Sequence, residues 1–322
     1  MNRSPDPVPP QRGHTEPDSP VDLSRRDWKA TLKRTLKDVK QDRITLVAAG
    51  MAMLWFLAVF PALIAAVGFL GLVEASPALV GGIQDGIRAT LPGDAADVLV
   101  ESVRASQTQS ETASGVAAFA GLGLALWGAS SGMVAMQTGL NIAYDVPKER
   151  KFARARGTAF VLILAVAVLG GIASALLVFG DPIGEAVRGA FPLGDAFLVV
   201  WNVIRWVVTV VAIVTLFAVI YYVAPNRANP RWTWVSPGGL VATAIWIAAS
   251  VGFSLYVSSL GNYAKTYGSL AGVVVLLLWL YLTAVAIMLG GELNAELERQ
   301  AEHRRRQKAQ ATVERERPRR ST

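Results

Sequence analysis

The chain contains no cysteine and only two histidines, and charged residues make up only 17% of its 322 residues. Without cysteine there is no disulfide scaffold, no thiolate zinc site and no cysteine nucleophile. Both histidines, His14 and His303, lie in polar end segments, so histidine acid–base chemistry inside a folded core is excluded. A soluble domain usually carries about 25% charged residues. The low charge therefore points away from a soluble globular protein.

Six long stretches of the sequence contain no Asp, Glu, Lys or Arg. They are residues 44–73, 112–144, 157–180, 206–226, 232–264 and 266–291. A helix that crosses the roughly 30 Å hydrocarbon layer of a bilayer needs about 20 mainly apolar residues. Each stretch reaches that length, so the sequence predicts an all-α polytopic membrane protein with six transmembrane helices.

The basic residues predict the orientation of these spans, because positive charge is retained on the cytoplasmic side. One set of alternate segments holds 26 Lys and Arg residues: 1–43, 145–156, 225–231 and 292–322. The connections between them hold four: 74–111, 181–195 and 261–268. Six spans with both termini in the cytoplasm satisfy this pattern throughout.

The sequence divides into four parts. Residues 1–24 form a polar, Pro-rich tail that is typical of disorder. The apolar run of the first span begins only after Arg43, so we do not expect this span to be a cleaved signal peptide. Residues 25–43 form a basic amphipathic helix, residues 44–292 the six-span domain, and residues 293–322 a basic cytoplasmic tail. Within the outer connection 74–111, apolar residues at helical spacing predict two short amphipathic helices.

The predicted helix 25–43 has an apolar stripe with lysines and arginines on the rest of its surface. The stripe consists of Trp28, Leu32, Leu36 and Val39. Such a helix can lie in the membrane interface, with the stripe at the acyl boundary and the lysines on anionic headgroups. A cytoplasmic cap packed on the bundle is the alternative.

Catalytic motifs are absent. The sequence has no phosphate loop, no dinucleotide glycine fingerprint and no His-Glu-x-x-His, so we expect no enzyme activity, no cofactor and no metal. Ser130 and Ser131 lack a candidate base nearby in sequence, and serines in a span more often bond a backbone carbonyl. The arginines at 304–306 predict nonspecific attraction to phosphate or lipid headgroups, not a specific nucleic-acid partner.

Polar residues at membrane depth are costly unless they are satisfied. Gln137 and Asn141 are candidates to line a polar cleft that opens to the cytoplasm, with helix packing as the alternative. Arg205 precedes Ala224 by 19 residues, so its side chain can extend to the outer interface. Pro61, near the middle of the first span, predicts a kink that serves either packing or bending.

Charged residues at the cytoplasmic ends of the first and last spans form another candidate set. Asp42 and Arg43 precede the first span, and Glu292 and Asn294 follow the last one. They are placed to pair across the bundle as a latch, and capping of helix ends in solvent is equally consistent.

Several short motifs carry a family resemblance. They are Asp42-Arg43, Ala48-Ala49-Gly50, Phe60-Pro61, Trp127-Gly128-Ala129-Ser130-Ser131-Gly132 with Asn141 and Tyr144, Ala224-Pro225-Asn226, Trp234-Val235-Ser236-Pro237-Gly238, Thr266-Tyr267-Gly268-Ser269-Leu270, Leu278-Trp279-Leu280-Tyr281 and Gly290-Gly291-Glu292-Leu293-Asn294-Ala295-Glu296. Over about residues 25–300, the chain resembles the YihY/BrkB family of bacterial inner-membrane proteins, some of which carry a ribonuclease BN label. Ala264 departs from the family, which often has Asn there.

The resemblance implies six spans in the bacterial inner membrane, both termini in the cytoplasm, and a link to envelope lipid or lipopolysaccharide transport. Membrane lipids are then the expected partners. The residues to test are Gln137, Asn141, Arg205, Lys265, Tyr267 and Glu292. Arg205 and Lys265 would attract anionic headgroups at the outer leaflet, and Pro61 would permit bending.

Two other functions compete with lipid transport. A non-transporting scaffold would bind an envelope partner through residues 74–111 or through the cytoplasmic tails. A ribonuclease of the metallo-hydrolase kind is disfavoured, because the sequence lacks the histidine ligands that such an enzyme needs.

Overall fold

The computed structural model describes residues 25–72, 81–82, 84–85, 88, 96–97, 100–101, 104, 115–191, 196–227, 230, 232–259 and 269–316. Every regular element in this part of the chain is a helix, and none of it is strand. The all-α prediction is therefore confirmed. The described residues between 81 and 104 are also helical, which agrees with the short helices predicted within 74–111.

The helices follow the uncharged stretches of the sequence. They are α1 (Arg25–Gln41), α2 (Ile44–Leu72), α5 (Gly115–Ala143), α6 (Phe152–Ala165), η2 (Val166–Gly170), α7 (Gly171–Ala190), α8 (Ala196–Val223), α9 (Trp232–Ser259) and α11 (Ser269–Glu316). The backbone stays helical where α6, the π-helical turn η2 and α7 meet, so these three elements form one unbroken segment.

Five helical stretches in the described part are long and apolar enough to cross a bilayer. They are Ile44–Ala62, Phe152–Ala190, Ala196–Val223, Pro237–Val257 and Ala271–Glu302, and they correspond to five of the six predicted spans. The remaining predicted span, 112–144, contains α5, whose 29 residues carry no charge. The chain is a multi-pass membrane protein whose helices are compatible with six crossings.

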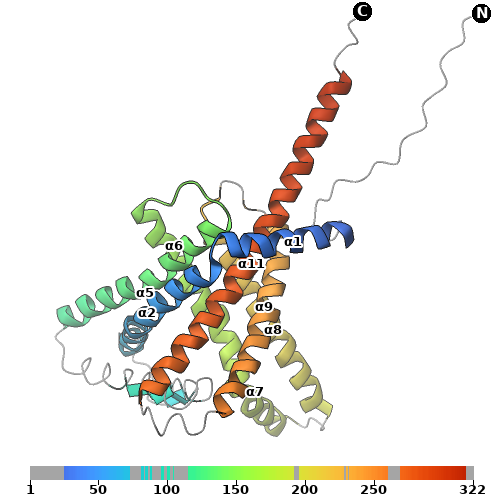
Figure 1. Cartoon of the computed structure of the whole chain (residues 1–322). Coiled ribbons are helices and arrows are strands. Elements are labelled where there is room, and N and C mark those ends of the chain that lie inside the picture. Colours follow the sequence, from blue (N-terminus) through green and yellow to red (C-terminus); the bar gives the residue numbers. More distant parts are fainter. Residues whose placement is uncertain are drawn as a thin grey trace, which may run out of the picture.

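The helices pack around a core that brings distant parts of the chain together. In Figure 1, α2 lies beside α5, α9 lies beside α11, and α7 pairs with α8 on the side away from α5. The core residues Met51, Leu140, Tyr221 and Met288 are buried where α2, α5, α8 and α11 meet. The Tyr221 hydroxyl is satisfied there, because it donates to the carbonyl oxygen of Ile287 at 2.9 Å.

Glycine permits the closest helix crossings. A Cβ added to Gly238 in α9 would overlap the carbonyl oxygen of Gly290 in α11. A Cβ added to Gly128 in α5 would lie 2.7 Å from the Cβ of Pro61 in α2. Small residues thus allow the backbones to approach. Because α2 is helical on both sides of Pro61 and this proline packs against α5, the structure supports the packing alternative for Pro61.

Helix α1 lies across α11 at one end of the bundle, and α11 continues beyond the bundle on that side (Figure 1). Trp28 packs against Leu293 and Leu297 of α11. The basic tail predicted from residue 293 therefore starts as a helix that is continuous with the last span.

The stripe predicted for α1 is divided between two surfaces. Trp28 and Val39 are partly buried, as predicted for packing on the bundle, and Thr31 and Thr35 are buried beside them. Leu32 and Leu36 instead remain 56% and 58% exposed. The face that meets the bundle consists of Trp28, Thr31, Thr35 and Val39, which are three, four and four residues apart. Leu32 and Leu36 each follow a threonine by one residue, so they point about 100° away from that face.

Candidate functional site

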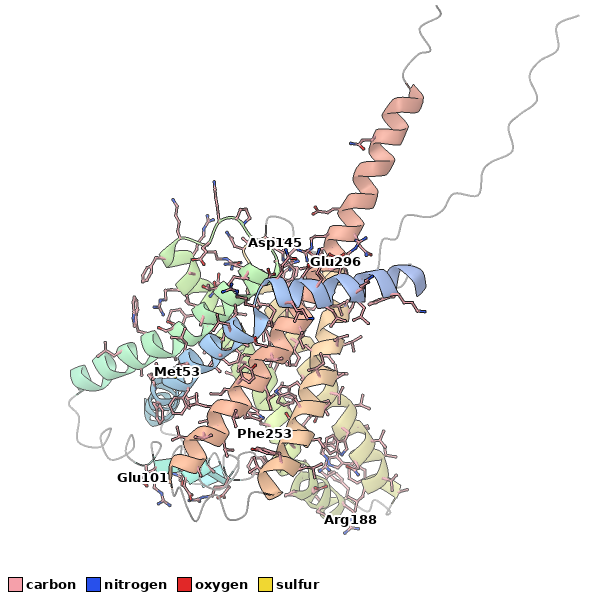
Figure 2. The ribbon with its side chains drawn as sticks, in the orientation of Figure 1. Met53, Glu101, Asp145, Arg188, Phe253 and Glu296 are labelled. Carbon is pink, nitrogen blue, oxygen red and sulfur yellow. The ribbon has the colours of Figure 1, made fainter. Side chains whose placement is uncertain are left out.

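The polar side chains relevant to function gather at the two ends of the bundle. Figure 2 shows Asp145 and Glu296 close to the crossing of α1 and α11, and Arg188 at the opposite end. We call these the α1 end and the Arg188 end. The basic segments 145–156 and 225–231 border helices that end at the α1 end, which is the end predicted to face the cytoplasm.

At the α1 end, Gln137 joins α5 to the connection that follows it. Its buried amide nitrogen donates to the carbonyl oxygen of Ala155 at 3.0 Å, and its amide oxygen accepts from Arg150 at 3.4 Å. Arg150 also donates to the carbonyl oxygens of Val223 and Pro225, both at 2.9 Å, and to that of Ala224. Arg150 thus satisfies carbonyl groups at the C-terminal end of α8, which lack partners within the helix.

Burial also affects the pKa of Arg150. Desolvation lowers the pKa of its guanidinium below the ordinary value. Arginine nevertheless stays protonated in proteins, so this group carries its positive charge to the carbonyl end of α8, where the helix dipole favours a cation.

Asn141 fastens the same region from the next turn of α5. Its side-chain oxygen accepts a hydrogen bond from the backbone N–H of Asn226 at 2.8 Å, and the Asn226 amide donates to the carbonyl oxygen of Lys148 at 2.8 Å. The motif Ala224-Pro225-Asn226 is therefore held by residues from two other segments. These contacts support the helix-packing alternative for Gln137 and Asn141.

A second cluster connects α1, α5 and α11 through Arg299. The Arg299 guanidinium pairs with Asp38 of α1 at 2.9 Å, with Asp145 after α5, and with Glu296 of its own helix at 3.2 Å. Arg34 of α1 also reaches Glu296, at 3.1 Å. Arg34 and Asp38 of α1 are thus joined to Glu296 and Arg299 of α11. These residues are not the ones predicted to form a latch, which were Asp42 and Arg43 with Glu292 and Asn294.

Glu292 lies deeper, beneath this cluster, and is fully buried. Asp42, the other acidic residue of the predicted latch, shares a side-chain hydrogen bond with it, and Arg299 and Asp38 lie close by. Burying a carboxylate is costly unless it is paired and hydrogen-bonded, so Asp42 and Arg299 are the contacts that support Glu292 at this position. Asn294, by contrast, accepts from the backbone N–H of Gly238 at 2.8 Å.

Arg156, on the first turns of α6, reaches the serines of α5. Its Nη1 donates to the hydroxyl of Ser131 at 3.0 Å, to the carbonyl oxygen of Trp127 at 3.2 Å and to the hydroxyl of Ser130. Both serine hydroxyls in turn donate to the carbonyl of Trp127, at 2.7 and 3.3 Å. This confirms the prediction that these serines bond a backbone carbonyl.

Two aromatic rings flank the Arg156 guanidinium. Its Cζ lies 4.4 Å from the ring centroid of Trp127 and 5.5 Å from that of Phe152. These rings are 51% and 65% exposed, whereas Ser130 is fully buried. Arg156 therefore bridges the buried interior of α5 and an exposed aromatic surface. We call Arg156, Ser130, Ser131, Trp127 and Phe152 the Arg156 site.

Arg205 lies on α8, toward the Arg188 end, and is held by its neighbours. Its Nη1 is 2.6 Å from Asp181 of α7, and its Nη2 donates to the side-chain oxygen of Asn202 at 2.9 Å. A Cβ added to Gly180 would overlap the Arg205 side chain, so this glycine makes room for it. Arg205 is almost buried, while Asp181 is 80% exposed. Lys265, Tyr267 and the departing Ala264 lie outside the described residues.

Sequence reasoning missed the four arginines that organise these sites. The charge pattern of the sequence shows these residues only as positive charges that orient the spans; they are Arg150, Arg156, Arg227 and Arg299. Arg227 pairs with Glu298, donates to the carbonyl oxygen of Tyr221 at 2.6 Å and lies 4.5 Å above the ring of Tyr144. The available signal was that Arg, rather than Lys, adjoins the motifs, since a guanidinium can bond several carbonyls at once.

Comparison with known proteins identifies relatives along most of the chain. Residues 35–315 match the family described as virulence factor BrkB. The chain is similar to the putative ribonuclease-like protein YfkH of Bacillus subtilis strain 168, with 38% identity over 250 residues, 78% of this chain and 88% of that protein. No solved structure matches.

More distant relatives are described as UPF0761 membrane proteins. The one from Tolumonas auensis is 36% identical over 78 residues, 24% of this chain and 26% of its own. The one from Verminephrobacter eiseniae is 24% identical over 277 residues, 86% of this chain and 64% of its own.

Proposed function

This chain belongs to the BrkB family of membrane proteins, and we propose that it assists the transport or transfer of envelope lipids, including lipopolysaccharide, across the bacterial inner membrane. Both termini then lie in the cytoplasm, and membrane lipids are the partners. The observation that carries this proposal is a pair of arginine sites near opposite ends of one helix pair, each next to apolar surface that acyl chains can cover.

The spacing of the two sites supports this proposal. Arg156 and Asp181, the ion-pair partner of Arg205, are 25 residues apart on the unbroken segment α6–η2–α7. This separation corresponds to about 38 Å at the helical rise of 1.5 Å per residue. A bilayer with its headgroup layers is roughly 40 Å thick. One arginine site therefore fits each headgroup layer, where it can meet lipid phosphate.

The surface between the two sites suits acyl chains. Along this segment, the exposed large side chains are apolar and include Phe160, Leu164, Val168, Ile172 and Leu177. The π-helical turn η2 ends at Gly170 in the middle of the segment, and single π turns often mark functional sites in helices. The proposed mechanism is thus to hold headgroups at both membrane faces while acyl chains remain in contact with the helix surface.

The test is lipid movement in reconstituted vesicles. We expect the full chain, in vesicles of phosphatidylethanolamine and phosphatidylglycerol, to move a fluorescent phospholipid between leaflets several-fold faster than protein-free vesicles do. Arg205→Ala and Lys265→Ala should slow this movement, and Arg188→Ala, a change of a partly exposed arginine at the same end, should leave it unchanged. A wild-type protein that leaves the lipid distribution as in protein-free vesicles would falsify the transport function.

A scaffold that binds an envelope protein is the second candidate. It is favoured by α11, which continues as a helix to Glu316 and extends beyond the bundle (Figure 1). If the chain works as a scaffold, removing the residues after 302 abolishes capture of its protein partner. In that case the full chain in vesicles moves lipid no faster than protein-free vesicles do. The transport proposal expects the shortened chain to move lipid like the full one.

A further inference from the structure

We infer that the Arg156 site binds the phosphate of an anionic phospholipid in the leaflet at the α1 end. This inference rests on the proposed lipid function and adds the class of lipid and the residue that binds it. Three features of the site support it: unused hydrogen-bond donors, a guanidinium held in place by the protein, and an aromatic surface next to exposed positive charge.

The first feature is the unused edge of the guanidinium. All three hydrogen bonds of Arg156 leave from Nη1. Among the described residues, Nε and Nη2 have no acceptor. These two nitrogens present parallel N–H groups, which is the geometry that binds two oxygens of one phosphate. The side chain is only partly buried, so this edge can meet a ligand.

The second feature is the way the protein fixes the arginine. Ser130 is fully buried and is itself anchored to the Trp127 carbonyl, so it gives the guanidinium a rigid partner. Ser131 and the Trp127 carbonyl hold the same nitrogen. Little side-chain entropy is then left to lose when a phosphate binds, and pre-organisation of this kind strengthens binding.

The third feature is the surface around the site. Trp127 and Phe152 are exposed beside the guanidinium, and Trp is enriched at the headgroup level of membranes. Lys151 and Arg154, on the first residues around the start of α6, are exposed as well. Apolar rings next to basic groups match the boundary between acyl chains and phosphates, whereas a soluble phosphate would use only the basic groups. This combination favours a phospholipid as the occupant.

The test is competition between two lipids for the full chain. We would mix the detergent-purified protein with equal amounts of phosphatidylglycerol and phosphatidylcholine and count the retained molecules of each by native mass spectrometry. We expect wild type to retain phosphatidylglycerol several-fold over phosphatidylcholine and Arg156→Gln to lose most of that preference. Arg156→Lys should lose part of it, because an ammonium group keeps the charge but not the paired donors.

Controls separate this site from general basicity and from free phosphate. Arg154→Gln removes an exposed charge two residues away and should keep the preference; an equal loss in both variants would show a diffuse basic surface and overturn the inference. Equal retention of the two lipids by wild type would do the same. If millimolar inorganic phosphate displaces phosphatidylglycerol completely, the site takes phosphate alone and the lipid assignment is wrong.

Two further measurements keep the result interpretable. Melting temperatures of all variants in detergent show whether Arg156→Gln is folded, and Arg156→Lys serves as the readout if it is not. The vesicle assay measures movement separately. If the protein prefers phosphatidylglycerol but moves no lipid, this inference stands and the proposed transport function is wrong. If the protein moves lipid but has no preference for phosphatidylglycerol, the transport function stands and this inference is wrong.

Discussion

At the scale of single residues, two arginines of this protein, Arg150 and Arg156, donate within the described part of the chain to backbone carbonyl groups and to buried side chains instead of pairing with carboxylates. Arg150 is the clearest case, because it satisfies three consecutive carbonyls at the end of α8 from a position 74 residues away in sequence. We expect Arg150→Ala to destabilise the protein by about 1–3 kcal/mol, since carbonyl groups lose their donor in a partly buried place. The measurement is the melting temperature in detergent. Arg154→Ala, an exposed change in the same connection, is the control and should shift it little.

Gly238 supports a second prediction at this scale. A Cβ there overlaps the backbone of Gly290, which cannot move without shifting α11. We expect Gly238→Ala to cost about 1–3 kcal/mol, as overpacking does in well-packed cores. Gly252 lies on the same helix with nothing within 4 Å of an added Cβ, so Gly252→Ala is the matched control and should be neutral or slightly stabilising. Equal melting temperatures for both variants would contradict the close α9–α11 crossing.

Residue-level contacts were the least predictable part of the structure. Gln137 and Asn141 were recognised as polar residues within an apolar span, and Glu292 as a charged residue at the end of another. Their partners were not, because Asn141 meets a backbone N–H 85 residues away. No periodicity encodes such a pairing. It depends on how α5 and the α8–α9 connection meet in space.

At the scale of helices, the sequence predicts the structure much better than it predicts contacts between single residues. Length and lack of charge locate the spans because the bilayer imposes a minimum apolar length on any crossing helix. The division of the α1 stripe was not predicted, since helical spacing groups residues on one side but does not say which part meets the bundle. The π-helical turn was likewise hidden, because it changes hydrogen bonding without changing composition.

Helix α1 provides a prediction at this scale. Leu32 and Leu36 face away from the bundle on adjacent turns, with exposed Lys29 and Lys33 nearby, so we expect the leucines to dip into the acyl boundary and the lysines to stay at the headgroups. Because the chain has no cysteine, a spin label can be placed with one substitution. In vesicles, a label on Leu36→Cys should collide with oxygen, and one on Lys33→Cys with a water-soluble nickel complex.

The two labels also define the contrary result. If both nitroxides report the same access to water, α1 is a cap above the membrane rather than an interfacial helix. The pairs between Arg34 and Glu296 and between Asp38 and Arg299 hold α1 on α11 in either case, so the comparison concerns only the outward face of the helix.

At the scale of the whole molecule, the distribution of charge predicts six crossings with both chain ends on one side of the membrane. Basic residues accumulate at the α1 end, and an even number of crossings returns the chain to the side on which it began. We expect Lys29→Cys and Gln310→Cys to react with a membrane-impermeant maleimide from the same side, and Arg188→Cys from the other. Intact spheroplasts should therefore label Arg188→Cys alone, and inverted vesicles the other two.

The described helices fit either six crossings or five, and this experiment decides between the two. If α5 did not cross, Lys29 and Gln310 would be on opposite sides, and only one of them would react in inverted vesicles. The Arg299 cluster argues against that arrangement. It brings Asp38 of α1, Asp145 after α5 and Glu296 of α11 to one guanidinium, and three segments can meet there only if the ends of these helices lie on the same side of the membrane.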